Sequence, residues 1–194
     1  MEIATFMNFY DFTFTWSIVF QIDLEQQIKY VSDKIESWFS SMNTKSSNGD
    51  IENLLLIMAN LPDFLKLSVC RKKVKELMEM NESEKKETIA RSLTSINLIN
   101  QDKLVELTKT WMKVISEIDP DELTKLLYSY LLILDDVKLF DKIDGKLILN
   151  IFHSLEEGER IKLLVSLKEA VFLNPTRGDI LKKIPADLVK VILN

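Results

Sequence analysis

The chain has 194 residues, of which 46% are hydrophobic and 28% charged, and its formal net charge at pH 7 is −5. This length and mix indicate one soluble globular domain with a substantial core, and the acidic balance argues against nucleic-acid binding. A single cysteine excludes an internal disulfide and indicates a reducing, cytoplasmic setting, and a single histidine excludes any site that needs two. Gly and Pro, four of each, are scarce, which favours long helices.

Residues 1–22 form an aromatic-rich arm whose pattern differs from that of the rest of the chain. Between Phe12 and Ile22 one side of the pattern is wholly apolar: Phe12, Phe14, Trp16, Ile18, Phe20 and Ile22. A period of two with aromatic and β-branched residues predicts a strand, and a strand needs a partner for its edges. We therefore expect the arm to form a hairpin with residues 3–10, to pair with a second copy in a homodimer, to pack on the helical body, or to become helical.

The arm also approaches the length of a membrane segment, about 20 residues. Asp11 and the absence of flanking Lys or Arg weigh against a span. No basic region precedes the apolar part, so a secretory signal is not expected.

An amphipathic helix is predicted for residues 23–42. Asp23 can cap it, with Gln26 three residues on as a capping-box partner. Its apolar residues repeat at helical spacing on one side: Leu24, Ile28, Val31, Ile35, Trp38, Phe39 and Met42. The next eight residues, 43–50, contain no apolar side chain. The sequence therefore predicts an arm plus one helix at 1–42, a polar linker at 43–50 and a helical body at 51–194.

Helix-start signals follow one another closely in the helical body. Asn81 precedes Glu84 by three residues, as in a capping box, and Asn100 or Asp102 can begin the following helix. The predicted helices cover residues 51–60, 62–78, 81–96, 100–118, 119–134, 147–155, 156–172, 180–184 and 185–192, with a short turn-rich piece at 135–144.

The helix at residues 119–134 has the most complete start signal, because Asp119 can cap it and Pro120 suits its first position. Six residues form an apolar stripe at offsets 0, 3, 4, 7, 8 and 11: Leu123, Leu126, Leu127, Tyr130, Leu131 and Leu134. Leu132 and Ile133 lie off that stripe, which predicts packing on more than one side and a central position. We expect Leu127 to be deeply buried. In the helix at 156–172, we expect four residues to face inward: Ile161, Leu164, Val165 and Val171.

Three helix starts, at Asn81, Asp119 and Glu156, lie 38 and 37 residues apart, and each has a Glu three residues later. A period near 40 built from two antiparallel helices is typical of a stacked α-solenoid. The period is similar to that of HEAT-type repeats in length only. The predicted fold class is therefore all-α, with stacked antiparallel helix pairs in either a HEAT-like α-solenoid or an irregular helical bundle.

Side chains with catalytic or metal-binding potential are isolated. Cys70 and His153 each lie within a predicted helix, without a partner at a useful spacing. Four carboxylates surround Gly145, but apolar residues interrupt them and the final Glu of an EF-hand is missing: Asp135, Asp136, Asp141 and Asp144. The sequence has no Gly-rich phosphate loop and no paired-Cys zinc spacing. We therefore expect no enzymatic activity, no cofactor and no metal site.

A partner-binding surface is the remaining functional feature. The one basic concentration of the sequence lies near residues 66–75. The candidate partner-binding residues are Phe12, Phe14, Trp16, Arg71, Lys72 and Lys75. The sequence favours a non-enzymatic protein-interaction or scaffold module that binds another protein and no nucleic acid. The alternative is a membrane-associated helical protein that inserts residues 3–22 into the bilayer or its interface.

Overall fold

The computed structural model describes residues 50–136 and 144–193, which belong to one compact unit spanning residues 45–194. Every regular element in these two ranges is a helix, which confirms the predicted all-α class for them. The helices are α3 (Asp50–Asn60), α4 (Asp63–Glu79), α5 (Glu82–Ser95), the 3₁₀ helix η2 (Ile96–Leu98), α6 (Gln101–Ser116), α7 (Pro120–Asp136), α8 (Gly145–His153), α9 (Glu157–Leu173), α10 (Arg177–Lys183) and α11 (Ala186–Leu193). The aromatic arm, the predicted helix at 23–42 and most of the turn-rich piece lie outside the described residues.

Several helices begin at the capping residues that the sequence predicts. The Asn81 side chain accepts a hydrogen bond from the backbone N–H of Glu84 at 3.0 Å. Asn100, rather than Asp102, caps α6 by accepting from the N–H of Asp102. Asp119 accepts from the N–H of Asp121 at 3.0 Å at the start of α7. These side chains satisfy first-turn donors that have no partner within the helix.

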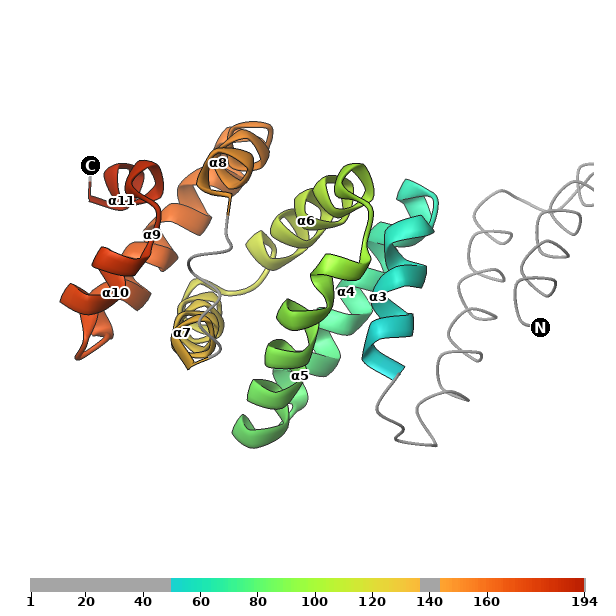
Figure 1. Ribbon diagram of the computed structural model, residues 1–194, viewed down its shortest axis with the longest axis horizontal. Helices are drawn as coiled ribbons and strands as arrows, with labels where there is room; N and C mark the ends of the chain where they lie inside the picture. The colour runs from blue at the N-terminus through green and yellow to red at the C-terminus, as the bar shows by residue number, and fades with distance from the viewer. Residues whose placement is uncertain (1–49, 137–143, 194) are drawn as a thin grey trace, which may run out of the picture. The chain divides into compact units, whose positions relative to one another are not determined.

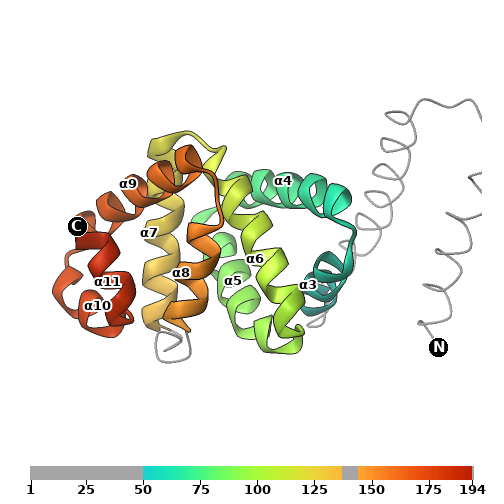
Figure 2. The same cartoon turned by 90° about the horizontal axis from the view of Figure 1, so that it is seen from above.

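The helices pack in two alternating rows. In one row α3 packs on α5, α5 on α7 and α7 on α9. In the other row α4 packs on α6, α6 on α8 and α8 on α11. Figure 1 shows the helices following one another in chain order from α3, in cyan, to α11, in red, and Figure 2 shows the same succession from above. From α3 to α8 each helix therefore packs on the helix two positions along the chain, or on the one two positions before it, whereas α10 packs on α9, and α11 packs on α8 and α9.

Polar contacts connect helices within these rows. The carboxylate of Glu169 on α9 accepts a hydrogen bond from the Thr124 hydroxyl of α7 at 3.2 Å. Arg71 of α4 donates two hydrogen bonds, of 2.8 and 2.7 Å, to the carboxylate of Glu117, the C-cap residue that follows α6. These contacts fix the register of neighbouring helices in addition to the apolar packing.

The central position predicted for α7 is confirmed, because α7 packs on α5 and on α9. Leu123, Leu126 and Ile133 are all buried, and Ile133 is one of the two residues off the predicted stripe. The prediction that Leu127 is deeply buried is wrong, since this residue is only half-buried. Leu127 packs against the cluster that α7 and α9 form with α10 and α11. These last two helices have seven and eight residues and cover only part of that side of α7.

The prediction for α9 is wrong for two of the four residues expected to face inward. Ile161 and Val165 are 56% and 57% exposed, whereas Leu163, Ser166 and Ala170 are buried. Apolar residues occur all around α9, so their spacing does not select one face. Two of the buried residues have small side chains, which allows α7 to come close, and the Ser166 hydroxyl lies 3.5 Å from the Pro120 carbonyl oxygen.

Candidate interaction surface

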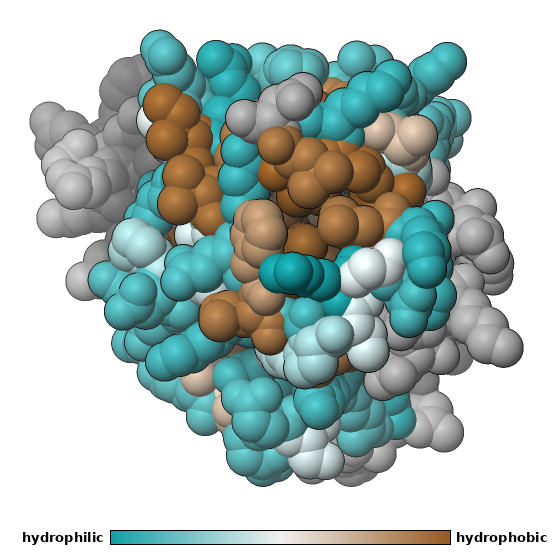
Figure 3. Space-filling view, turned by 90° about the vertical axis from the view of Figure 1, so that its left-hand side faces the viewer, coloured by the Kyte–Doolittle hydropathy of each residue, from teal (hydrophilic) through white to brown (hydrophobic). Residues whose placement is uncertain are grey.

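Exposed large apolar side chains concentrate at the end of the rows formed by α8 to α11. Among the described residues seven such side chains are exposed, and five of them lie on α9 or α11: Ile161, Val165, Phe172, Leu173 and Leu193. Figure 3, which views this end directly, shows a large apolar patch near its centre with smaller apolar areas beside it and hydrophilic surface around them. A contiguous exposed apolar patch with a polar rim is typical of an interaction site.

Three of these residues share one side of α9 and are called the α9 face below: Ile161, Val165 and Phe172. At 3.6 residues per turn, Val165 and Phe172 lie within about 40° of Ile161 around the helix axis. The buried residues Leu163 and Ala170 lie about 180–200° from Ile161, on the side that packs on α7. The α9 face therefore points away from α7, where the next helix of the row would lie if the row continued.

Charged side chains of both signs lie around the α9 face, and the exposed Glu157 is about 40° from Ile161 around the helix axis. Lys168 lies on the same side of the helix, between Val165 and Phe172, and Lys162 lies on its flank. The guanidinium carbon of Arg177 lies 5.6 Å from the centre of the Phe172 ring, a cation–π arrangement. α9 as a whole contains three basic and three acidic residues.

The six partner-binding candidates predicted from the sequence lie elsewhere. Phe12, Phe14 and Trp16 are outside the described residues. Arg71, Lys72 and Lys75 lie on α4, and Arg71 is held by its two hydrogen bonds to Glu117. Hydrogen bonding from Arg71 keeps the pKa of Glu117 below its usual value. The basic segment of α4 is thus partly used for packing between α4 and α6.

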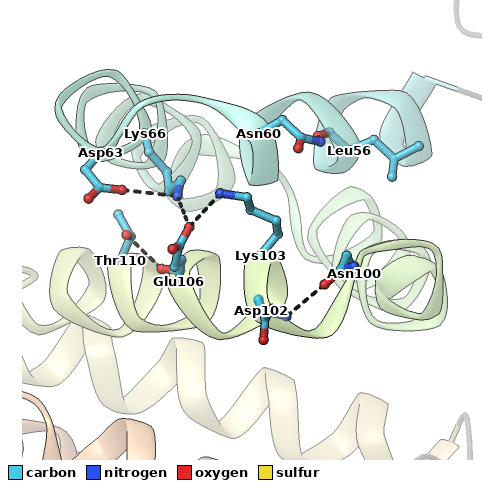
Figure 4. Close-up of polar contacts among 9 residues, drawn as sticks. All are labelled: Leu56, Asn60, Asp63, Lys66, Asn100, Asp102, Lys103, Glu106 and Thr110. Carbon is cyan, nitrogen blue, oxygen red and sulfur yellow. Dashed lines mark hydrogen bonds and ion pairs between the residues drawn. The ribbon is translucent and has the colours of Figure 1, made fainter.

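Lys66, the first residue of that basic segment, lies inside the protein. Its side chain is 1% exposed, and its Nζ lies 3.3 Å from a carboxylate oxygen of Glu106 on α6 and 3.3 Å from one of Asp63. Lys103 also reaches Glu106, as Figure 4 shows. The hydrogen bonds from Lys66 and then Lys103 lower the pKa of Glu106. A buried cation without a counter-charge is strongly destabilising, so this group holds α4 on α6 and is structural.

Cys70 and His153, the two side chains with reactive potential in the sequence, lie on different helices, α4 and α8. Burial raises the pKa of the Cys70 thiol to about 12, against the smaller opposing effect of Lys66. A thiol with that pKa is almost wholly protonated at neutral pH and is a poor nucleophile. His153 is exposed at the end of α8, where its ring lies edge-on to Phe152 at 5.8 Å between centres.

Residues 50–136 and 144–193 contain no group of three or more His, Cys, Asp or Glu side chains that could hold a metal ion. None of the helices in these ranges is both long enough and apolar enough to cross a membrane.

Comparisons of the chain with protein-family models, with curated proteins and with solved structures found no match. A function is therefore inferred from the packing and the exposed side chains of the described residues.

The sequence contains the residues of the α9 face but does not reveal their exposure. Periodicity alone assigned Ile161 and Val165 to the core. The small residues Ser166 and Ala170 are the signal that could have corrected this, because small side chains mark the side of a helix that packs closely on a neighbour.

Proposed function

We propose that the chain is a non-enzymatic protein-interaction or scaffold module, built as a short HEAT-like α-solenoid, whose α9 face binds a helix of another protein chain. The observation that carries this proposal is the exposure of Ile161, Val165 and Phe172, at 56%, 57% and 59%, on one side of α9.

The packing of the helices supports the solenoid. Stacked helix pairs bring first helices onto first helices and second helices onto second helices. The contacts of α3, α5, α7 and α9, and those of α4, α6, α8 and α11, follow this order. The starts of α5, α7 and α9 also follow the period near 37–38 residues found in the sequence. An irregular helical bundle, the other arrangement that the sequence predicts, requires neither this order of packing nor a regular period between helix starts.

The end of such a stack explains why the α9 face is a binding surface. Solenoids end in repeats whose outer side is polar, because an apolar outer side exposes the packing surface meant for a neighbour. The outer side of α9 is apolar, so it offers a helix the same kind of surface that α7 offers α9. An amphipathic helix that lies along it would bury all three side chains of the α9 face.

Affinity purification of the tagged chain from cells of the organism that produces it tests this function. We compare the wild-type chain with the double variant Ile161→Glu/Val165→Glu and with Phe64→Glu, a matched control because Phe64 is 56% exposed on α4. The proposal expects a bound protein that wild type and control retain alike. The amount of that protein recovered with the double variant should be at least about tenfold lower, which corresponds to a loss of about 1.4 kcal/mol or more in binding free energy.

Equal recovery of every bound protein by the wild-type chain and the double variant would contradict the proposal. Circular dichroism of each variant checks that the helices are intact. Both positions are more than half exposed, so the helix content should not change.

A further inference from the structure

We propose that the α9 faces of two copies of the chain pack against each other as an antiparallel pair, which gives a homodimer with two-fold symmetry. This inference rests on the proposed function of the α9 face and names the helix that the face binds, which is α9 of a second copy. Two observations carry it: two charged side chains on the α9 face that lack a partner, and their spacing relative to the exposed apolar side chains.

The two charged residues, Glu157 and Lys168, lie on the same side of α9 as the exposed apolar residues. Around the helix axis Glu157 lies about 40° and Lys168 about 20° from Ile161, in the same direction. Val165 and Phe172 lie about 40° and 20° from Ile161 in the other direction. The α9 face therefore has one charged flank, with a carboxylate in the first turn of the helix and an ammonium group in its second half.

Both charges are available to a partner. Neither the Glu157 carboxylate nor the Lys168 ammonium group has a hydrogen-bond or ion-pair partner among residues 50–136 and 144–193. Arg160, three residues after Glu157, donates instead to backbone carbonyl oxygens in the turn before α9. The residues three and four positions from Lys168 are all apolar: Leu164, Val165, Val171 and Phe172. α9 itself therefore offers Lys168 no carboxylate.

The spacing of these residues makes the α9 face complementary to itself. In an antiparallel pair, a two-fold axis at right angles to both helices places residues opposite each other when they lie equally far on either side of that axis. The midpoint between Glu157 and Lys168 is position 162.5, and the midpoint between Ile161 and Val165 is position 163. At 1.5 Å per residue these midpoints differ by less than about 1 Å along the helix.

A single two-fold axis near residue 163 therefore makes two kinds of contact at once. It places Glu157 opposite Lys168 of the second copy, and Ile161 opposite Val165 of the second copy, each of them twice. Because such an axis keeps each flank on its own side, the charged flank of one copy meets the charged flank of the other. The apolar middle of the contact is then bordered by two ion pairs between copies.

A parallel pair of α9 helices does not have this match. It would bring Glu157 level with Glu157 and Lys168 level with Lys168, and like charges across an interface reduce affinity. The match also favours a second copy over an unrelated helix, because α9 itself carries the two charges at the spacing that the face requires.

The proposed contact is isologous, since both copies use the same surface, and it closes at two chains. The row α3, α5, α7 and α9 then continues across the two-fold axis into the same row of the second copy. Association should rise with concentration, and raised salt should weaken the contribution of the ion pairs by screening them.

Charge reversal in the full-length chain tests the inference. Lys168→Glu would place two carboxylates opposite each other, and Glu157→Lys would place two ammonium groups opposite each other. Sedimentation velocity from about 1 to about 100 μM spans the range in which modest affinities are measurable. The wild-type chain should approach twice the 22.5 kDa of one chain as concentration rises. Each reversal should raise the dissociation constant about tenfold or more at low salt.

Two combinations should restore association. The double variant Glu157→Lys/Lys168→Glu exchanges the two charges and should associate with a dissociation constant within about threefold of the wild-type value. An equimolar mixture of the two single variants should associate more tightly than either variant alone, because each chain then supplies the charge that the other lacks. Recovery in the double variant also shows that neither reversal prevents folding.

Three further variants serve as controls. Lys125→Glu makes the same change of charge at an exposed position of α7 and should associate as the wild-type chain does. Phe64→Glu, at an exposed position outside the α9 face, should also associate normally. Val165→Glu places a charge in the apolar middle of the contact and should stay at 22.5 kDa at every concentration.

The outcomes separate this inference from the proposed function. Wild-type chains that stay single up to about 100 μM overturn the inference, and so do dimers that Val165→Glu leaves intact. Charge reversals that neither the double variant nor the mixture rescues overturn it as well. If wild-type chains stay single while affinity purification still recovers a protein that depends on Ile161 and Val165, the proposed function stands with another occupant. If neither a dimer nor such a protein is found, both fail.

Discussion

At the scale of single residues, burial in this protein depends on which neighbour a side chain meets. Leu126 and Leu127 are adjacent on α7 and chemically identical, yet Leu126 is 1% exposed and Leu127 is half-buried. A helix turns 100° between them, so that Leu126 faces the packed core while Leu127 faces the short terminal helices.

Leu126→Ala should therefore be more destabilising than Leu127→Ala. Full burial predicts a loss of about 2–5 kcal/mol in the free energy of unfolding for Leu126→Ala, from lost transfer energy and a cavity. The cost at Leu127 should be smaller by about 1 kcal/mol or more, because part of its side chain already meets water. Urea denaturation of both variants measures the difference. Equal losses would contradict the different burial of the two residues.

Gly145 and Gly178 form a second informative pair. A Cβ added at Gly145 would lie 2.6 Å from Cβ of Pro185, whereas one added at Gly178 has nothing within 4 Å. Gly145 therefore allows α8 to approach the residue that precedes α11.

We expect Gly145→Ala to lower the free energy of unfolding by about 1–3 kcal/mol through overpacking. Gly178→Ala should be neutral or stabilising by up to about 1 kcal/mol, since Ala favours helix more than Gly does. Thermal unfolding of the two variants compares them directly. A Gly145→Ala variant as stable as the wild-type chain would show that α8 and α11 do not approach this closely.

At the scale of helices, the sequence predicts starts well and packing faces less well. The side chains of Asn81, Asn100 and Asp119 cap helices through hydrogen bonds to residues two or three positions away, so a local pattern suffices to find them. The exposed side of α9 depends on where α7 packs, which no local pattern encodes. Lys66 shows the same limit, because its burial depends on Glu106, 40 residues along the chain.

The contact of α4 with α6 through Lys66 and Glu106 predicts a specific pH dependence. The pKa of Glu106 is lowered from 4.5 in the folded chain by its hydrogen bonds to Lys66 and Lys103. A lowered pKa in the folded state means that the stabilisation is complete above the unfolded value and is lost as pH falls through the folded value. Between about pH 5 and pH 3, the free energy of unfolding should therefore fall less steeply in Glu106→Gln than in the wild-type chain.

Urea denaturation at several pH values measures the two slopes. Identical slopes for Glu106→Gln and the wild-type chain would mean that the ion pair contributes nothing to acid stability.

At the scale of the whole molecule, the all-α class followed from composition and helical period, because both are averages over many residues. The helix starts on which the internal period depends, Asn81, Asp119 and Glu156, each lie one residue before a helix of the structure. The interaction surface could not be predicted in the same way. The candidates Arg71, Lys72 and Lys75 were chosen for charge, whereas the α9 face lies on the side of α9 opposite α7, and the sequence alone does not show which side of α9 packs on α7.

The central claim is that the α9 face binds a helix of another chain, and a photo-reactive side chain placed at Val165 tests it most directly. Val165 is 57% exposed at the middle of the α9 face, so the substitution leaves the core intact. On illumination the account predicts cross-links from position 165 to a helix of another protein chain, which mass spectrometry should identify. The same group at Phe64 should give no cross-link to that helix. If illumination of the variant with the photo-reactive group at position 165 gives no cross-link to another protein chain, the claim is contradicted.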